Sequence, residues 1–244
     1  MNGNKILVVD DETEITELIT LYMEQDGFVV HSTDNGEDAI MLAHELNPDL
    51  IILDISLKGL DGFEVCTRIR TVSSVPILFI SCKSDDTDII HGLTVGGDDY
   101  MTKPFSPSQL VARVKAHLRR QSVFEQRRTE RELEEVMNFD GLVIDLPART
   151  VHVMDKEVFL SAKEFDLLVQ LARSPNRAFA LDDLYTIVWG HDSMGDTRTL
   201  MVHISNLRKK IEPDPANPIF IVTVRGVGYK FNIKEGSSST YVQG

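Results

Sequence analysis

The stretch Leu50-Ile51-Ile52-Leu53 ends on a single acidic residue, Asp54. Three other short runs also lead into polar residues: Ile6-Leu7-Val8-Val9 into Asp10-Asp11, Ile77-Leu78-Phe79-Ile80 into Ser81, and Tyr100-Met101-Thr102 into Lys103-Pro104. Short apolar runs separated by helical patterns are typical of buried strands in a parallel sheet. Ligand sites of such sheets gather at the carboxyl ends of the strands. The sequence therefore predicts one compact polar site at this edge.

Helical patterns separate these runs, at residues 13–25, 36–46, 62–71, 85–94 and 106–120. Parallel strands joined by helical crossovers form a doubly wound sheet with both faces covered. For residues 1–120 we therefore predict an α/β doubly wound (βα)5 domain with a five-stranded parallel sheet.

The second part of the chain has a different pattern. Residues 121–138 are mostly charged and lack Gly and Pro, which predicts a linker that extends the preceding helix. Strand-like pieces follow at 142–145, 150–154 and 158–160, then helical patterns at 162–173, 182–189 and 197–211. Strands at 219–224 and 229–233 predict a closing β-hairpin. We expect an α+β domain over residues 139–235 and a disordered tail over 236–244.

Composition restricts the class of protein. The chain of 244 residues is long enough for two domains with separate cores. No apolar run approaches the roughly 20 residues of a membrane helix, and the amino terminus lacks the pattern of a signal peptide. Two cysteines, Cys66 and Cys82, indicate no disulfide framework, so we expect a cytoplasmic protein with no membrane partner. We expect Cys82 to be buried in packing.

The net charge of −13 is concentrated in the first domain. Residues 1–120 carry 10 Lys and Arg against 20 Asp and Glu, whereas residues 139–244 carry 12 against 13. Local clustering rather than total charge decides nucleic-acid binding. The balanced second part, with its basic cluster Arg208-Lys209-Lys210, therefore stays a candidate for binding DNA.

The residues at the predicted sheet edge suit phosphoryl chemistry. Mg²⁺ prefers hard oxygen ligands such as the carboxylates of Asp10, Asp11 and Asp54. Asp54 is the best nucleophile candidate, because it alone ends the central strand and carboxylates can form acyl phosphates. Lys103 would neutralise one phosphoryl oxygen, and Ser81 would donate a hydrogen bond to another. The peptide bond before Pro104 is a candidate for the cis form.

The helical pattern at 197–211 has two faces. Leu200, Ile204, Leu207 and Ile211 form an apolar stripe, and Arg198, Val202, Ser205 and Lys209 form a more polar one with Asn206 beside it. One face would pack on the domain and the other would be free for the major groove of DNA. Arg can read guanine, Asn can pair with adenine, and Val202 could touch a thymine methyl group. The Arg208-Lys209-Lys210 cluster is better suited to phosphates.

The chain resembles a two-component response regulator of the OmpR/PhoB subfamily, which joins a receiver domain to a winged helix-turn-helix domain. The receiver motifs are Val9-Asp10-Asp11-Glu12, Leu53-Asp54, Ser81 and Lys103-Pro104-Phe105, in family order and spacing. The resemblance implies that Asp54 accepts the phosphoryl group and that Asp10, Asp11, Asp54 and the Ser56 backbone carbonyl bind Mg²⁺. It makes Ser81 and Tyr100 the switch pair and Lys103 the phosphate-sensing lysine. Movement of Ser81 would let Tyr100 turn inward.

The second domain is similar to the family's DNA-binding domain, with the recognition helix at 198–210 and the wing at 223–229. The resemblance implies these DNA-binding residues: Arg198, Thr199, Val202, His203, Ser205, Asn206, Arg208, Lys209, Lys210, Thr223 and Arg225. It places Arg225 in the minor groove and makes the loop from Trp189 to Gly195 face RNA polymerase. We expect His203 to be packed or phosphate-contacting rather than a metal ligand.

The resemblance also implies a homodimer, formed on phosphorylation through the fourth helix, fifth strand and fifth helix. The implied interface residues are Ile89, Asp98, Asp99, Gln109, Arg113 and Arg120. Three positions of the implied interface depart from the family pattern: Ile89 stands where a cation is usual, Gln109 where an acid is usual, and Thr94 where an acid would face Lys115. Two departures lie elsewhere: Lys58 stands where a Pro is usual, and Ala180 where a Ser helix cap is common. Because exposed ion pairs contribute only about 0.2–1 kcal/mol each, Ile89 could substitute apolar contact.

We therefore expect a phosphorylation-dependent regulator of transcription. A sensor histidine kinase would phosphorylate Asp54, and the dimer would bind direct-repeat promoter DNA with half-sites about one helical turn apart. We expect no enzyme activity beyond Mg²⁺-dependent self-phosphorylation and autodephosphorylation. Two alternatives stay open: a phosphatase acting on external substrates, and a regulator whose DNA binding ignores the phosphoryl group.

Overall fold

The computed structural model describes residues 3–126, 136–190, 197–233 and 240–241. The chain divides into two compact units, Met1–Arg120 and Gln121–Gly244. The elements of the first unit alternate strand and helix: β1 (Lys5–Val9), α1 (Thr13–Gln25), β2 (Val29–Thr33), α2 (Gly36–Leu46), β3 (Leu50–Asp54), α3 (Gly62–Arg70), β4 (Ile77–Ser81), α4 (Asp86–Thr94), β5 (Asp99–Thr102) and α5 (Pro107–Gln126).

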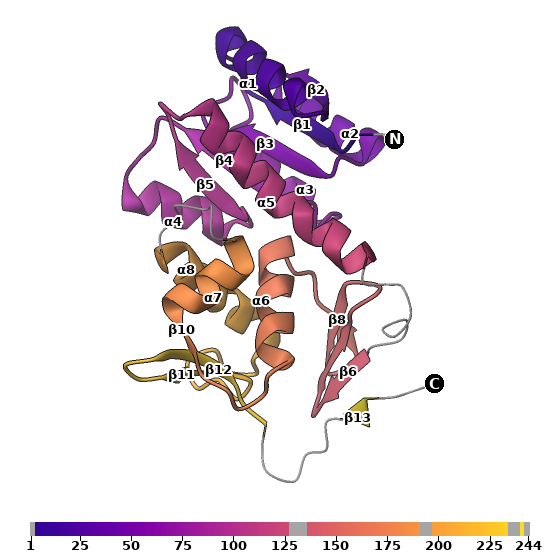
Figure 1. Ribbon diagram of the computed structural model, residues 1–244, viewed down its shortest axis with the longest axis vertical. Helices are drawn as coiled ribbons and strands as arrows, with labels where there is room; N and C mark the ends of the chain where they lie inside the picture. Colours follow the sequence, from indigo (N-terminus) through magenta and orange to yellow (C-terminus); the bar gives the residue numbers. More distant parts are fainter. Residues whose placement is uncertain (1–2, 127–135, 191–196, 234–239, 242–244) are drawn as a thin grey trace. The chain divides into compact units, whose positions relative to one another are not determined.

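The five strands form one parallel sheet in the order β2-β1-β3-β4-β5 (Figure 1). This confirms the predicted doubly wound fold, with β3 at its centre. Side chains of a strand alternate between the two faces of the sheet. Ile6 and Val8 pack with residues of α1 and α5, whereas Leu7 and Val9 pack with residues of α2 and α3. Because helices cover both faces, the strand ends are the natural place for polar chemistry.

A close approach of α3 to β3 fixes one side of that edge. A Cβ atom on Gly62, the first residue of α3, would lie 2.2 Å from the carbonyl oxygen of Asp54. Only glycine fits such a contact without a backbone shift. The segment after β3 therefore returns directly against the end of the strand, beside the backbone of Asp54.

The described residues of the second unit form two small sheets and three helices. Its elements are β6 (Val136–Phe139), β7 (Leu142–Asp145), β8 (Thr150–Val153), β9 (Lys156–Glu157), α6 (Ala162–Ala172), β10 (Phe179–Ala180), α7 (Leu181–Trp189), α8 (Thr197–Ile211), β11 (Ile221–Val224), β12 (Gly228–Phe231) and β13 (Thr240–Tyr241). The sheet orders are β13-β6-β7-β8-β9 and β10-β12-β11. One apolar core joins the three helices to both sheets.

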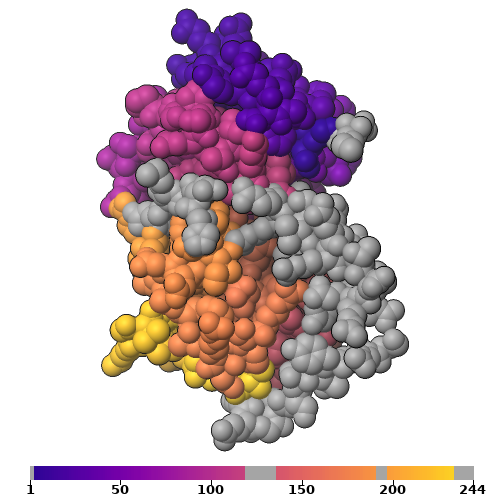
Figure 2. Space-filling model, viewed as in Figure 1, coloured from indigo at the N-terminus to yellow at the C-terminus, as the bar shows by residue number. Residues whose placement is uncertain are grey.

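The hairpin of β11 and β12 projects from this unit, as the yellow projection at the lower left of Figure 2. Its turn includes Gly226, whose φ of +74° lies in the left-handed region that favours glycine. The predicted hairpin is confirmed, although its strands are shorter than expected. Its tip carries Arg225, which is exposed.

Three predictions about the second half of the chain are wrong in part. The linker was expected to extend the preceding helix and to end at 138; α5 does continue to Gln126, as expected, but β6 already begins at Val136. The strand expected at 158–160 lies instead at Lys156–Glu157. Part of the tail expected to be disordered forms β13, in which Thr240 pairs with Asn138 of β6. The rest of the linker and tail, at 127–135, 236–239 and 242–244, lies outside the described residues.

Local geometry explains the first two differences. Met137 and Phe139 are buried whereas Asn138 is exposed, so β6 has the alternation of a half-buried strand. Because β6 has only four residues and directly follows a charged segment, this alternation could not be recognised in the sequence. Met154 and Asp155 both have positive φ, of 48° and 62°, as in the tight turns that join hairpin strands. The turn pairs Lys156 with Val153, so β9 begins immediately after it.

Candidate functional site

The side chain of Lys103 lies at the centre of the predicted polar site. Its ammonium nitrogen is 2.9 Å from Oδ2 of Asp10, 2.8 Å from Oδ2 of Asp54 and 2.8 Å from Oε1 of Glu12. These residues come from the ends of β1, β3 and β5, so the sheet brings distant parts of the sequence to one edge. The peptide bond between Lys103 and Pro104 is cis, as predicted.

Burial and neighbouring charges shift the pKa values of two members of this cluster, Asp10 and Lys103. Asp10 and Asp54 are buried, and they accept backbone hydrogen bonds from Glu12 at 2.9 Å and Ser56 at 3.1 Å. Burial raises the pKa of Asp10, and the Asp54 charge adds to this, although Lys103 and the Glu12 amide lower it. Burial lowers the pKa of Lys103, but its carboxylate partners raise it above its usual value. One charged lysine thus faces three carboxyl groups, which leaves excess negative charge.

The donor set fits a hard divalent cation. Carboxylate oxygens of Asp10, Glu12 and Asp54 lie within 4.8 Å of one another, and Mg²⁺ prefers such oxygen ligands. Asp11, one of the expected ligands, is outside this group, and its Oδ2 lies 3.4 Å from Nζ of Lys58. Glu12 was not expected as a ligand; its place directly after the acidic pair was the one signal in the sequence.

The two residues of the expected switch are joined through the backbone of Lys83. Ser81 is buried, and its hydroxyl accepts a hydrogen bond from the Lys83 amide at 3.2 Å. Tyr100 is only 7 % exposed, and its hydroxyl donates to the Lys83 carbonyl oxygen at 2.8 Å. From the sequence we expected Tyr100 to turn inward only after Ser81 moves. In the structure the Tyr100 side chain is already buried, and Ser81 is buried as well. Burial raises the pKa of Tyr100 to about 12, so its hydroxyl is a proton donor at neutral pH.

Asp99, expected at a dimer interface, is buried and paired within its own unit. Both carboxylate oxygens contact Nη1 of Arg113, at 2.8 and 2.7 Å, and Nε2 of His117 lies 3.6 Å from Oδ2. Burial alone would raise the pKa of Asp99, but the charge of Arg113, together with His117, holds it well below its usual range. The Asp99 carboxylate is therefore charged and neutralised inside the unit.

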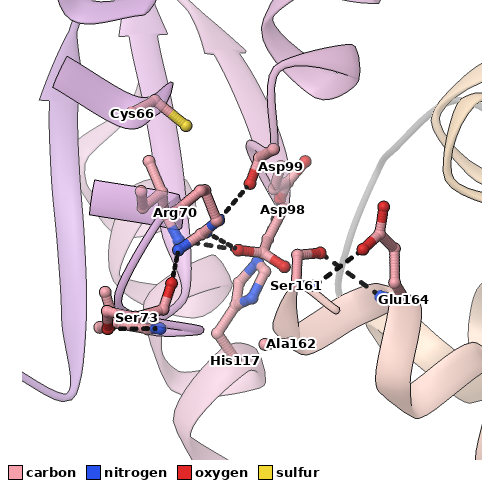
Figure 3. Close-up of polar contacts among 12 residues, drawn as sticks. Cys66, Arg70, Ser73, Asp98, Asp99, His117, Ser161, Ala162 and Glu164 are labelled. Carbon is pink, nitrogen blue, oxygen red and sulfur yellow. Dashed lines mark hydrogen bonds and ion pairs between the residues drawn. The ribbon is translucent and has the colours of Figure 1, made fainter. Parts of the chain in front are cut away.

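Asp98 is neutralised in a similar way by an unexpected partner, Arg70 of α3 (Figure 3). Nη2 of Arg70 lies 2.8 Å from Oδ2 of Asp98, which also accepts the Ile77 amide at 2.9 Å. The guanidinium further donates to the carbonyl oxygens of Gly96 and Ser73. Asp98 thus joins α3 to the start of β5, a role that no local sequence pattern indicated.

The remaining residues of the expected interface differ in exposure. Gln109 is exposed, Ile89 is half-buried, and the side chain of Arg120 lies outside the described residues. Lys115, expected to face position 94, forms an ion pair with Asp26 of α1's C-cap.

Helix α8 has the two faces that the sequence predicted, with one change. Leu200, Ile204, Leu207 and Ile211 are buried, whereas Arg198, Ser205 and Lys209 are exposed and Val202 is half-buried. Asn206, expected beside the polar stripe, is only 4 % exposed, and Thr199 and His203 are also buried. The three lie at spacings of four and three, so they form a stripe of their own next to the apolar one.

Two residues of the basic cluster make contacts inside the unit. Arg208 donates from Nε and Nη2 to the carbonyl oxygen of Ile221, at 2.9 and 2.7 Å, and to Oγ1 of Thr223 at 2.9 Å. Its guanidinium also lies over the ring of Tyr229, 5.4 Å from the centroid. Arg208 therefore fixes the projecting hairpin to α8. Thr223 and Arg225, on that hairpin, are exposed.

Lys210 joins the end of α8 to the start of α6. Its Nζ lies 2.6 Å from Oε2 of Glu164, whose side chain is 2 % exposed. The same Glu164 forms the predicted capping box with Ser161, whose amide donates to Oε2 at 2.8 Å (Figure 3). Lys209 is exposed beside them. The described contacts thus give Lys210 a structural partner, where phosphate contact was expected.

Other expectations are settled by burial. His203 is packed, with its ring 5.4 Å from that of Trp189. Cys82 is exposed, so its expected burial is wrong: it follows the last residue of β4 and points away from the core, whereas Cys66 is buried. Ala180 precedes α7 without a side-chain cap, as its side chain requires.

Comparisons with known proteins agree with both units. The model of the response regulator receiver domain matches residues 6–115, and that of the C-terminal domain of transcriptional regulatory proteins matches residues 155–231. A DNA-binding response regulator MtrA of Mycolicibacterium smegmatis is 43 % identical over 226 residues, which cover 93 % of this chain and 96 % of the relative. The chain belongs to the OmpR/PhoB subfamily of two-component response regulators.

Two further known proteins are similar to this OmpR/PhoB response regulator, one in sequence and one in fold. The transcriptional regulatory protein SrrA of Staphylococcus aureus is 39 % identical over 233 residues, covering 95 % of this chain and 97 % of the relative. A solved RitR mutant has the same fold, with a TM-score of 0.80 and 24 % identity over 95 % of this chain and all of that one. The receiver and DNA-binding domains make this response regulator a transcription factor under phosphorylation control. Among its described residues, no helix combines the length and apolar character needed to span a bilayer.

Proposed function

We propose that Asp54 accepts a phosphoryl group from a sensor histidine kinase and that this controls binding to promoter DNA. One observation carries the proposal: Asp54 ends the central strand in direct contact with Lys103 and beside Asp10. The arrangement supplies a carboxylate nucleophile, a cation for the transferred group and acidic metal ligands. Membership of the response regulators favours this function over a phosphatase acting on external substrates.

The positions of these side chains support the following course for the transfer. Asp10, Asp11, Asp54 and the Ser56 carbonyl would hold Mg²⁺, which when bound neutralises phosphate oxygens of the donor. An Asp54 oxygen would form a bond to phosphorus as the bond from phosphorus to the donor histidine nitrogen breaks. That nitrogen would keep the electron pair. Lys103 would exchange carboxylate contacts for a phosphoryl oxygen, and Ser81 would donate a hydrogen bond to another.

The response would pass from Ser81 to Tyr100 through Lys83. A movement of Ser81 toward the phosphoryl group would displace the backbone of Lys83, whose N–H donates to Ser81. The carbonyl oxygen of Lys83 accepts the hydrogen bond from the Tyr100 hydroxyl, so this bond would change as well. This would alter the face formed by α4, β5 and α5, through which we propose that the protein dimerises. Since Asp98 and Asp99 already have partners within the unit, we assign apolar contact at Ile89 and polar contact at Gln109 and Arg120 a larger share.

We propose that α8 enters the major groove of DNA. The exposed residues Arg198 and Ser205, with Val202, would contact base edges. Lys209 and Thr223 would contact phosphates, and Arg225 would reach the adjacent minor groove. Base reading by Asn206 would require its side chain to leave its buried position. A phosphorylated dimer would bind two direct-repeat half-sites about one helical turn apart.

We further propose the functional limits of the chain. The receiver would comprise residues 1–120 and the DNA-binding domain residues 136–233, joined by the segment between them. The loop after Trp189 would contact RNA polymerase. We propose a cytoplasmic protein, as expected for a partner of DNA, whose chemistry is restricted to phosphorylation and dephosphorylation of its own Asp54.

Selection from a randomised DNA pool tests this function. The full chain would be incubated with the pool, with and without acetyl phosphate and Mg²⁺, beside Asp54→Ala. We expect direct repeats to be enriched only by the phosphorylated wild type. Phosphate incorporation, measured in the same samples, should be absent in Asp54→Ala.

The other outcomes separate the alternatives. Equal enrichment in every sample would identify a regulator whose DNA binding ignores phosphate. Undiminished labelling of Asp54→Ala would overturn the assigned acceptor. Turnover of a generic phosphoester would favour the phosphatase alternative, and no enrichment at all would refute the role of α8.

A further inference from the structure

Lys58 is a second lysine at the acidic edge of the receiver. It lies between β3 and α3, and its Nζ is 3.4 Å from Oδ2 of Asp11. The side chain of Lys58 is 84 % exposed, whereas that of Asp11 is 15 % exposed. The backbone of Lys58 also forms an isolated parallel bridge with Asn35, which fixes the point from which the side chain starts.

The two lysines divide the expected metal ligands between them. Lys103 contacts Asp10 and Asp54, and Lys58 contacts Asp11. Asp11 is absent from the group of carboxylates whose oxygens lie within 4.8 Å of one another, although it follows Asp10 directly in the chain. The Asp11 carboxylate has instead an ion pair with Lys58, whose side chain is exposed.

We propose that Lys58 competes with Mg²⁺ for Asp11 and thereby weakens metal binding by this receiver. The inference rests on the proposed phosphoryl-accepting site. To bind the metal through Asp11, the protein must first break the pair with Lys58, whose ammonium group can then return to water. An exposed pair has a modest strength, so the competition adjusts the affinity for Mg²⁺ without preventing binding.

Titration of the full chain with MgCl₂ at constant ionic strength tests the competition. Binding is followed by amide chemical shifts, so the readout does not depend on phosphorylation. Lys58→Gln removes the charge and keeps a similar length, and it should lower the Kd for Mg²⁺ by about two- to five-fold; the upper limit corresponds to about 1 kcal/mol. Lys58→Arg keeps the charge and should restore the wild-type Kd. Lys115→Gln, which also removes an exposed, paired lysine, should leave it unchanged.

A double-mutant cycle distinguishes competition at Asp11 from a general loss of positive charge. In an Asp11→Asn background, Lys58→Gln should change the Kd by less than 1.5-fold. An equal effect in both backgrounds would overturn the competition, as would an unchanged Kd in Lys58→Gln alone.

The proposed function and this inference fail differently. If the wild type binds Mg²⁺ and Lys58→Gln binds it equally, only the inference is overturned. If the wild type does not bind Mg²⁺ at all, the proposed metal site and the inference are both overturned. A second measurement is the rise in thermal midpoint caused by Mg²⁺, which should be larger in Lys58→Gln than in the wild type at the same sub-saturating concentration.

Discussion

The hydroxyl of Tyr100 donates a 2.8 Å hydrogen bond to the carbonyl oxygen of Lys83. The amide of the same Lys83 donates to the hydroxyl of Ser81 at 3.2 Å. The backbone of one residue, Lys83, therefore contacts both residues of the proposed switch: its N–H contacts Ser81 and its carbonyl oxygen contacts Tyr100. A displacement of Ser81 would move the Lys83 carbonyl oxygen, which accepts the hydrogen bond from Tyr100. The proposed coupling between Ser81 and Tyr100 therefore passes through a single residue.

Tyr100→Phe should lower the free energy of unfolding by about 1 kcal/mol, because it leaves the Lys83 carbonyl without this donor. It should also reduce the gain in DNA affinity caused by phosphorylation. Urea denaturation and DNA titrations with and without acetyl phosphate measure the two effects. The control Tyr22→Phe removes the hydroxyl of a more exposed tyrosine on α1, and should change the free energy of unfolding by less than about 0.5 kcal/mol.

The raised pKa of Tyr100 predicts how this contribution depends on pH. Its folded-state value of about 12 exceeds the ordinary 10.0, so the folded state binds the proton more tightly. The corresponding stability is fully present below about pH 10 and is lost as pH rises towards 12. The wild type should lose its advantage over Tyr100→Phe in that interval. A difference between the two proteins that stays constant to pH 12 would contradict the role of the hydroxyl.

Lys103→Met should destabilise the metal-free receiver, because it removes the cation shared by Asp10, Glu12 and Asp54. Breaking a buried pair in this way costs about 3 kcal/mol. Mg²⁺ should restore part of the loss, since it supplies positive charge to the same carboxylates. Thermal unfolding in EDTA and in MgCl₂ measures both effects, with Lys115→Met as a matched control. Equal destabilisation with and without Mg²⁺ would count against a metal site in this cluster.

The sequence was sufficient to predict the elements that carry the receiver site. Asp10, Asp54 and Ser81 each follow an uninterrupted apolar run, Lys103 follows a shorter one that ends in Thr102, and a parallel sheet places the ends of such strands along one edge. This is why the meeting of Asp10, Asp54 and Lys103 could be expected without knowledge of the side-chain positions. The apolar stripe of α8 was also predictable, because residues three and four positions apart lie on the same face of a single helix.

The contacts that could not be predicted join residues with no fixed spacing between them. Arg70 lies in α3 and Asp98 directly before β5, and Lys210 and Glu164 lie in α8 and α6, so no local spacing relates the partners. The burial of Asn206 depends on packing around its helix, which the wheel alone does not specify. The pairing of β13 with β6 depends on a two-residue strand too short to have a recognisable pattern.

Arg113→Ala should destabilise the receiver even as a monomer, because it leaves the buried Asp99 carboxylate without its closest cation. We expect a loss of about 3 kcal/mol at pH 7, measured by denaturation at a protein concentration where the wild type is monomeric. Lys115→Ala removes a cation of the same helix whose pair with Asp26 is exposed, and should change the stability by less than about 1 kcal/mol. A variant that weakens only dimerisation would contradict the internal role of Arg113.

The pH dependence of this effect has a definite sign. The pKa of Asp99 is lowered in the folded state, so its contribution is present above the unfolded value near 3.9 and is lost as pH falls through the folded value. In Arg113→Ala, Asp99 can be protonated at a higher pH and then needs no cation. The difference in stability between wild type and variant should therefore begin to shrink as pH falls through the pKa of Asp99 in the variant, and should continue to shrink below about 4, where the wild type loses its own contribution.

The neighbouring lysines Lys209 and Lys210 should have separable roles. Lys209 is exposed on α8, so Lys209→Ala should weaken binding to all DNA sequences alike and reduce the slope of log K against log salt concentration by about 1. Lys210 pairs with the buried Glu164, so Lys210→Ala should instead destabilise the C-terminal unit, by about 1–2 kcal/mol given its partial exposure.

DNA titrations at several salt concentrations, combined with denaturation of both variants, separate these roles. Lys210→Met keeps the apolar stem of the side chain, so the difference in stability between Lys210→Met and Lys210→Ala measures the contribution of that stem to packing. The difference between the wild type and Lys210→Met measures the contribution of the ion pair with Glu164. If Lys210→Ala reduces the salt slope by as much as Lys209→Ala and leaves the stability unchanged, Lys210 contacts phosphate and its pair with Glu164 opens on binding. If only Lys209→Ala changes the slope, one of the two lysines faces the DNA and the other fixes α8 to α6.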